Sequence, residues 1–228
     1  MAYKNSFKIF IIIITTIGSV KSQSLQQIEK DLFRSINNSR ASSKDFFFEN
    51  IDKTLWPVAI GSPIILYGIS KYKNDEYLKN ASIILASSEL ATLIEFTILK
   101  HFIKRQRPFR NLQNVNTLDT IGIDEFSFPS GHASTAFSIA TTISLLYPDK
   151  KIIIPILIWA TTVSYGRIYL GVHYPSDVIS GAIIGGATSY FCFKFQNEIL
   201  NFTENKKGES LTLLPIQNGF YLNYQTTF

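Results

Sequence analysis

Apolar residues gather in five long runs, which short polar loops separate. The runs lie near residues 54–70, 80–99, 132–147, 152–170 and 178–195. Each is close to the ~20 residues that a helix needs to cross a bilayer, although the third is short and polar. The pattern predicts an all-α fold, a membrane-embedded bundle of five core transmembrane helices. Because Glu89 and Glu95 lie in the second run, where a membrane makes ionisable groups costly, a soluble all-α protein with buried helices is the alternative.

Two further segments precede these runs. Residues 1–22 place Lys4 and Lys8 before an apolar run, Ile9 to Val20, which has the length of a signal-peptide core and is too short to span a membrane. We expect a signal peptide, with a retained anchor as the alternative. In residues 23–53, apolar side chains at positions 25, 28, 32, 33 and 36 have helical spacing. They predict an amphipathic helix that lies on the membrane or packs on the domain.

Loop charge gives the five helices a direction. The loops at 71–79 and 148–151 and the tail after residue 195 carry lysines, as cytoplasmic segments do. The loop at 100–110 falls on the opposite side and is nevertheless basic, with Lys100, Lys104, Arg105, Arg107 and Arg110. This exception needs a chemical reason. The tail, residues 196–228, alternates polar and apolar residues around Asn218-Gly219, which predicts a short β-hairpin.

Composition favours a membrane location and argues against other classes. Apolar residues make up 46% of the chain and the mean hydropathy is +0.12, which is high for a soluble enzyme. The net charge of +5 would suit nucleic acid, anionic lipid or a phosphorylated substrate. Nucleic acid is disfavoured, because no basic patch is interleaved with aromatic residues. The single cysteine, Cys192, rules out an intramolecular disulfide framework.

The first polar cluster that could carry chemistry lies at the end of the second run. Lys100, Lys104 and Arg107 have a spacing that would place them on one helix face, and Pro108 biases Arg107 away from helical geometry. These cations could bind an anion. Interfacial cations that reach lipid headgroups would show the same pattern.

The second cluster is Phe-Pro-Ser-Gly-His, residues 128–132. Ser130 can cap the helix that carries His132, and Gly131 lets backbone N–H groups approach a ligand. A helix N-terminus attracts oxyanions because its N–H groups are free and its dipole end is positive. A plain cap beside a surface histidine is the alternative.

The third cluster contains Arg167, His173 and Asp177. Asp177 could accept a hydrogen bond from one imidazole nitrogen of His173, which would fix the tautomer and leave the other nitrogen free to attack. A structural Arg–Asp pair beside a bystander histidine is the alternative, but it does not explain the other two clusters.

Taken together, the clusters resemble the tripartite signature of the type 2 phosphatidic-acid phosphatase / vanadium haloperoxidase superfamily. The matching segments are Lys100-x6-Arg107-Pro108, Pro129-Ser130-Gly131-His132 and Arg167-x5-His173-x3-Asp177. The resemblance covers about residues 54–195, which we expect to form the phosphatase domain. The family usually has Ser before the third-cluster arginine, where this chain has Gly166.

The resemblance implies a role for each signature residue. His173 would attack phosphorus and form a phosphohistidine, Asp177 would orient it, and His132 would protonate the leaving oxygen and later activate water. The phosphate group would be bound by Lys100, Arg107 and Arg167, by the Ser130 hydroxyl and by the Gly131 backbone N–H. Three cations suit a phosphate monoester, which carries about −1.5 to −2 charges near neutrality. The family uses no metal or other cofactor.

These expectations describe an integral-membrane phosphatase that acts on a lipid phosphate at the periplasmic face of a bacterial cytoplasmic (inner) membrane. Candidate substrates are phosphatidic acid, phosphatidylglycerophosphate, undecaprenyl pyrophosphate and a phosphate of lipid A. The loop at 109–126 would determine the substrate. We expect its Asp119, Asp124 and Glu125 to be solvated charges, with contact to a headgroup as the alternative. Glu89 and Glu95 would pair with nearby cations, with orientation of the phosphate-binding cations as the alternative. A soluble periplasmic acid phosphatase, a vanadium haloperoxidase and a non-catalytic membrane scaffold are the alternatives.

Overall fold

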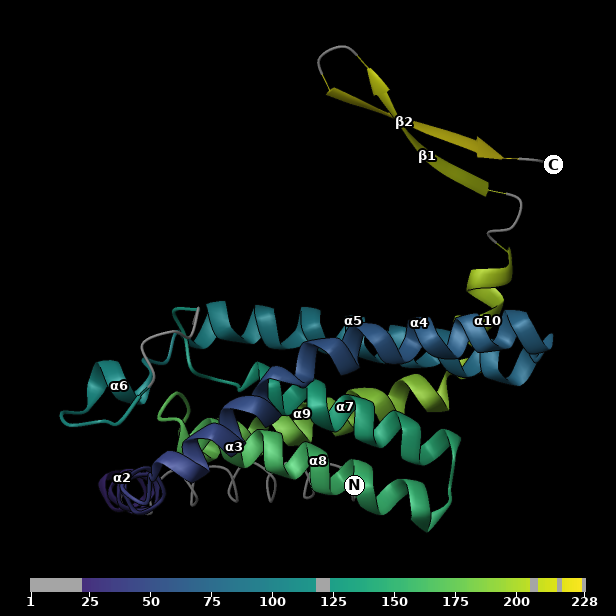
Figure 1. Ribbon diagram of the computed structural model, residues 1–228. Helices are drawn as coiled ribbons and strands as arrows, with labels where there is room; N and C mark the ends of the chain where they lie inside the picture. Colours follow the sequence, from purple (N-terminus) through teal and green to yellow (C-terminus); the bar gives the residue numbers. More distant parts are fainter. Residues whose placement is uncertain (1–21, 118–123, 206–208, 217–218, 227–228) are drawn as a thin grey trace, which may run out of the picture.

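The computed structural model describes residues 22–117, 124–205, 209–216 and 219–226, so the expected signal peptide or anchor falls outside this part of the chain. Helices make up most of it (Figure 1). They are α2 (Ser22–Asn37), α3 (Ser42–Lys53), α4 (Leu55–Lys73), α5 (Glu76–Ile103), α6 (Pro108–Asn111), α7 (Gly131–Leu146), α8 (Lys150–Tyr169), α9 (Pro175–Lys194) and α10 (Gln196–Asn205). In the tail, β1 (Glu209–Ile216) pairs antiparallel with β2 (Gly219–Thr226). The expected turn at Asn218-Gly219 lies partly outside the described residues.

A helix covers each of the five apolar runs, namely α4, α5, α7, α8 and α9. Within the described ranges, α5 and α8 are long and apolar enough to cross a membrane. A third candidate is α9 joined to the first part of α10, if this pair, bent by 69°, counts as one span. The fold is therefore helical with two or three candidate spans. Helix α7 has 16 residues, and at 1.5 Å per residue it is about 24 Å long, shorter than a hydrocarbon core of ~30 Å.

Helices α7 and α9 pack so closely that their backbones touch. A Cβ atom added to Gly185 would lie 2.0 Å from the backbone oxygen of Ser134, and one on Gly181 would lie 2.6 Å from that of Ser130. Between the helices, the hydroxyl groups of Ser138 and Ser189 are 2.8 Å apart. Small residues let membrane helices approach in this way, which explains why the third apolar run is rich in small side chains.

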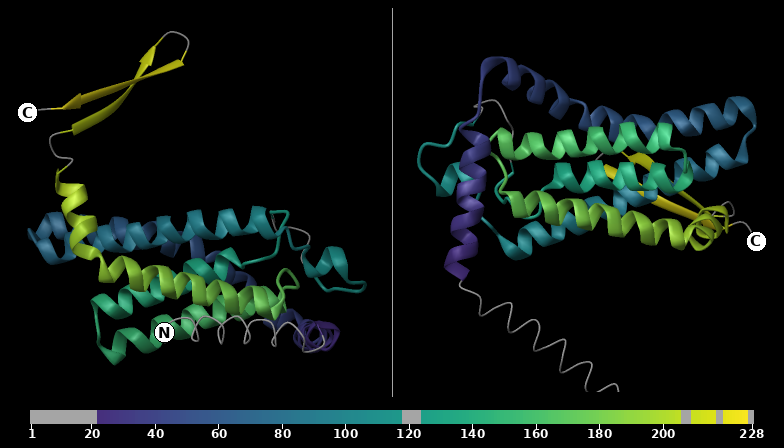
Figure 2. Two further views of the ribbon diagram at one scale, coloured as in Figure 1. Left: turned by 180° about the vertical axis from the view of Figure 1, so that it is seen from behind. Right: turned by 90° about the horizontal axis from the view of Figure 1, so that it is seen from below.

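Helix α2 lies across one end of the bundle (Figure 2). The helix that the apolar spacing predicts is present, but only part of its apolar face is covered. Phe33 is fully buried and Ile36 partly so, whereas Leu25, Ile28 and Leu32 are exposed. Phe33 packs against residues of α7, α8 and α9 and so fixes α2 to this end of the bundle.

The three polar clusters meet at the same end of the bundle (Figure 1). The backbone N–H of Ser130, before α7, donates to the backbone oxygen of Asp177 in α9 at 3.0 Å. Arg107, after α5, donates to the backbone oxygen of Val172, in the loop between α8 and α9, at 2.9 Å. Segments that lie far apart in the sequence therefore build one site.

Candidate active site

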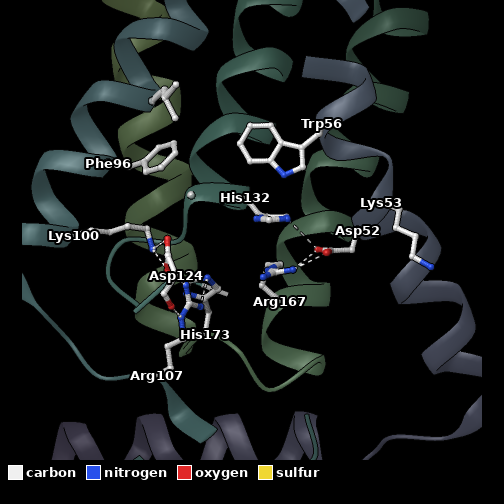
Figure 3. A pocket seen from close by; sticks show the side chains of 12 residues that line it. Asp52, Lys53, Trp56, Phe96, Lys100, Arg107, Asp124, His132, Arg167 and His173 are labelled. Atoms are coloured by element: carbon white, nitrogen blue, oxygen red, sulfur yellow. Dashed lines mark hydrogen bonds and ion pairs between the residues drawn. The ribbon is translucent and has the colours of Figure 1, made fainter. Parts of the chain in front are cut away.

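A cavity of about 390 Å³ opens at this end of the bundle. Figure 3 shows most of its side chains, and histidines, cations and carboxylates line its base while Trp56 and Phe96 line its apolar side. Six of the eight residues expected to act in catalysis or phosphate binding are among its lining: Lys100, Arg107, Gly131, His132, Arg167 and His173. The other two, Ser130 and Asp177, are fully buried behind it.

Lys100 and Arg107 share an acidic partner, Asp124. Lys100 Nζ lies 3.1 Å from one carboxylate oxygen of Asp124, and Arg107 Nη2 donates to the other. An isolated antiparallel β-bridge between the backbones of Gln106 and Phe126 brings Asp124 close to Arg107. Asp124 is exposed, as expected of a solvated loop charge, but its carboxylate also pairs with two buried cations, which the expectation did not include. Burial raises the pKa of Asp124, but Lys100 and Arg107 lower it by more, so the carboxylate is ionised.

Helix α5 ends before it can present three cations on one face. Lys104 adopts a left-handed conformation, with φ of 52°, and its side chain is exposed. The expectation that Lys104 shares a helix face with Lys100 and Arg107 is wrong, because this residue ends the helix and turns the chain. Arg107 follows in an extended conformation, with φ of −72° and ψ of 153°, as expected before Pro108.

His173 is enclosed and carries its lone pair on Nε2. The Nη1 atom of Arg107 lies 3.1 Å from this nitrogen. Because a guanidinium can only donate, Nε2 must accept, and the ring proton is then on Nδ1. Burial, followed by the charges of Arg107, Arg167 and Lys100, lowers the pKa of His173 well below its ordinary value. The ring is therefore a neutral imidazole with a nucleophilic nitrogen.

The contact between His173 and Asp177 is longer than predicted. Nδ1 of His173 lies 3.6 Å from Asp177 Oδ2, beyond hydrogen-bond distance, and has no hydrogen-bond partner among the described residues. The Asp177 carboxylate instead accepts from the backbone N–H of Tyr174 at 2.8 Å and from Arg105 Nη1 at 2.7 Å. Arg105 also donates to Glu29 of α2 at 2.6 Å. A chain of charges thus links α2 to the residue beside His173.

The start of α7 presents His132 to the cavity. Ser130 caps the helix as expected, and its hydroxyl oxygen accepts from the backbone N–H of Ala133 at 3.4 Å. Its binding of phosphate stays a prediction. At Gly131 an added Cβ atom would lie 3.0 Å from the ring of Phe96, so a larger residue would crowd this wall. The ring of His132 meets Trp56 edge to face, with centroids 6.1 Å apart.

Arg167 reaches the cavity beside His132 and is held by Asp52 of α3. Its Nη1 atom lies 2.6 and 2.7 Å from the two carboxylate oxygens of Asp52. His132 Nε2 lies 3.6 Å from the same carboxylate. Burial raises the pKa of Asp52, but His132 and Arg167 together lower it by more, and the resulting pKa is about 2. Arg167 Nε is buried and has no hydrogen-bond partner among the described residues, so it is a spare donor in the site.

The PAP2 superfamily model matches residues 80–200, which contain all three polar clusters. The chain belongs to the PAP2 superfamily. It is 49% identical over 61 residues to the lipid A 4'-phosphatase of Bacteroides thetaiotaomicron, a match that covers 27% of each chain. It is 32% identical over 119 residues to the undecaprenyl-diphosphatase of Sulfolobus acidocaldarius, covering 52% of this chain and 57% of that protein.

The matches therefore span only 27% and 57% of the lengths of these two curated relatives. A longer likeness is to the crystal structure of LpxE from Aquifex aeolicus. That comparison has a TM-score of 0.62 and 32% sequence identity, and it covers 72% of this chain and 93% of LpxE.

Three carboxylates that pair with cations in and around the site lie outside the PAP2 signature. Glu29 and Asp52 precede the matched segment, and Asp124 lies between two signature clusters. Sequence reasoning missed Glu29 and Asp52, because each reads as an ordinary polar position on a short helix. Arg105 was noted only as one more basic loop residue. The excess positive charge of this loop was the available signal that carboxylates from elsewhere must balance it.

The expectation that Glu89 and Glu95 pair with cations is wrong. Neither forms an ion pair with any described residue. Glu95 accepts a hydrogen bond from the hydroxyl of Thr188 in α9. Glu89 lines an apolar groove with Trp56 and Ile60, and its Oε1 is buried without a hydrogen-bond partner among the described residues. Among the described residues that line this groove, apolar side chains and Thr135 surround Glu89, and none is a cation.

In the described ranges, no three His, Cys, Asp or Glu side chains form a group that could hold a metal ion. The charged centre of the cavity is instead an array of cations around a neutral histidine. Such an array can bind a phosphoryl group and bring a nucleophile to it.

Proposed function

We propose that this PAP2 protein is an integral-membrane phosphatase that hydrolyses a lipid phosphate monoester or pyrophosphate through a phosphohistidine. The observation that carries the proposal is the position of His173. Its Nε2 lone pair lies beside Arg107, in a cavity that Lys100 and Arg167 also line. Preorganised cations stabilise the charge that develops on a transferring phosphoryl group.

In the first step, the phosphate displaces the Asp124 carboxylate and binds Lys100, Arg107 and the spare Nε–H of Arg167. Nε2 of His173 then forms a bond to phosphorus, and the bond from phosphorus to the leaving oxygen breaks with its electron pair on oxygen. Protonated His132 gives its proton to that oxygen, so the lipid alcohol, or the lipid monophosphate from a pyrophosphate, departs.

In the second step, neutral His132 takes a proton from water while the water oxygen attacks phosphorus. The nitrogen–phosphorus bond breaks and its electrons return to Nε2 of His173. Inorganic phosphate leaves, and His132 is protonated again. Asp177 balances the positive charge on the His173 ring while the phosphoryl group is attached. The Ser130 hydroxyl and the Gly131 backbone N–H stabilise the phosphoryl oxygens.

The proposed substrate is a lipid because the cavity is apolar on one side and the described part of the chain has two or three helices long and apolar enough to span a membrane. Trp56, Leu93 and Phe96 form the apolar side. The names of the relatives support a lipid A phosphate or undecaprenyl pyrophosphate, with phosphatidic acid and phosphatidylglycerophosphate as further candidates. In the arrangement we propose, residues 54–195 form a phosphatase domain with five spans in the bacterial inner membrane. The basic cytoplasmic loops then place the site at the periplasmic face.

Phosphate release by purified protein from a panel of lipid phosphates and pyrophosphates tests the function. We expect wild-type protein to release phosphate from at least one lipid of the panel and the His173→Ala variant to release none. His101→Ala is the matched control, because His101 is exposed at the end of α5 and, among the described residues, its side-chain hydrogen bond is to the Thr97 backbone oxygen of its own helix. Normal turnover by His173→Ala, or no release by wild type from any lipid, would refute the proposal.

A further inference from the structure

Asp52 lines the cavity although it lies outside the family match. It belongs to α3, and the PAP2 superfamily model begins at residue 80. Its carboxylate faces two signature residues at once, since Arg167 Nη1 and His132 Nε2 approach it from different helices (Figure 3). The side chain of Asp52 is 17% exposed, so bulk water screens these contacts only in part.

The packing of α3 on α8 explains how Asp52 reaches the site. Phe48, one turn before Asp52, packs on the rings of Tyr165 and Tyr169, with centroids 5.6 and 4.5 Å away. An added Cβ atom at Gly166 would lie 3.3 Å from the Phe48 ring. The residue at which this chain departs from the family signature thus leaves room for the helix that carries Asp52.

Resting on the function proposed above, we propose that Asp52 is a positioning residue for His132. It holds the imidazolium form of His132 at the mouth of the cavity, ready to protonate the leaving oxygen, while it also fixes Arg167. Burial and the charges of Arg167 and Arg107 oppose a proton on His132, and the Asp52 carboxylate, 3.6 Å from Nε2, is the group that favours one. Asp52 itself makes no bond to the substrate.

This role predicts a dependence on the leaving group. An alkoxide needs a proton as it leaves, whereas a nitrophenolate leaves without one, so weaker general acid catalysis slows the first and spares the second. If Asp52 served only to hold Arg167 for phosphate binding, its loss would slow both substrates equally. The ratio of the two rates therefore separates positioning of the acid from a structural role.

The experiment compares kcat/KM for dioctanoyl phosphatidic acid and p-nitrophenyl phosphate in wild type, Asp52→Asn and Asp52→Glu. The kcat/KM value reports the steps up to formation of the phosphohistidine. In Asp52→Asn we expect a loss of at least ~10-fold for the alkyl ester, within the ~10²–10⁴ that a positioned acid contributes, and less than about 3-fold for the aryl ester. Asp52→Glu, which keeps the charge, should recover part of the ratio.

Two controls keep the result decisive. Glu49→Gln removes another carboxylate of α3, one turn earlier, and should leave the ratio of wild type. In a His132→Gln background, Asp52→Asn should cause no further loss for the alkyl ester, because the residue acts through His132. The ratio is independent of the folded fraction, and Asp52→Glu supplies it if Asp52→Asn does not fold.

An equal loss on both substrates, or an additive loss in the His132→Gln background, would overturn the role of Asp52. A wild-type protein that hydrolyses neither ester would instead count against the proposed phosphatase.

Discussion

Removing the charge of Asp124 tests whether this carboxylate occupies the site of the phosphate. The Asp124→Asn variant keeps the size of the side chain and one oxygen acceptor. Lys100 and Arg107 would then lose their ionic partner in the empty site. A phosphate group that binds these cations would no longer have to displace a carboxylate, so it should bind more tightly.

The magnitude follows from the exposure of the two ion pairs. The Asp124 side chain is 56% exposed, whereas those of Lys100 and Arg107 are 6% and 3% exposed. A half-exposed pair is close to a surface salt bridge, and we take about 0.5–1 kcal/mol for each. Two pairs give about 1–2 kcal/mol, and since 1.4 kcal/mol is tenfold, the inhibition constant of inorganic phosphate should fall about 5- to 30-fold.

The assay measures inhibition of p-nitrophenyl phosphate hydrolysis by inorganic phosphate in wild type and Asp124→Asn. Glu125→Gln is the control, because Glu125 is an exposed neighbour whose side chain has no ion pair within the described residues. It should leave the inhibition constant within about twofold of wild type, as a remote, screened charge does. Weaker or unchanged phosphate binding in Asp124→Asn would refute the reasoning and indicate that Asp124 holds the two cations in place.

Three further predictions concern the buried charges and the helix packing. Arg105→Gln leaves the buried carboxylate of Asp177 without its cation and should destabilise the protein by about 3 kcal/mol. The melting temperature in detergent should fall by about 6–12 °C, far more than in the control Arg110→Gln at an exposed site. Gly185→Ala places a methyl group against the backbone of α7 and should sharply reduce the yield of folded protein, whereas Gly68→Ala, with nothing within 4 Å, should not. Because the pKa of His173 is lowered, its ring should stay neutral as the pH falls through 6.5; NMR of labelled histidines would contradict this if its signal titrated there.

The helices of the five apolar runs, helix α2 and the cluster residues could be predicted from the sequence, because hydropathy and residue spacing are local properties. The path of the chain after α5 could not. Lys104 ends the helix in a left-handed conformation, a position that glycine or asparagine usually occupies, so a lysine gives no sequence signal for it. The carboxylates of Glu29, Asp52 and Asp124 were also beyond local reasoning. Each meets its cation through the packing of segments that are separated in the sequence. The sequence around an acidic residue on a short helix or in a loop does not show whether that residue has a buried partner.

The close contact of α7 and α9 fixes one part of the site. Because the two backbones touch at Gly181 and Gly185, the helices cannot slide past each other without a clash. His132 begins one helix and Asp177 the other, so the proton donor and the partner of the nucleophile are parts of one rigid body. Any widening of the cavity to admit a large headgroup would then come from its other walls, which α3, α4 and α5 form. Binding and release of the substrate would be separated from the geometry of the chemical step.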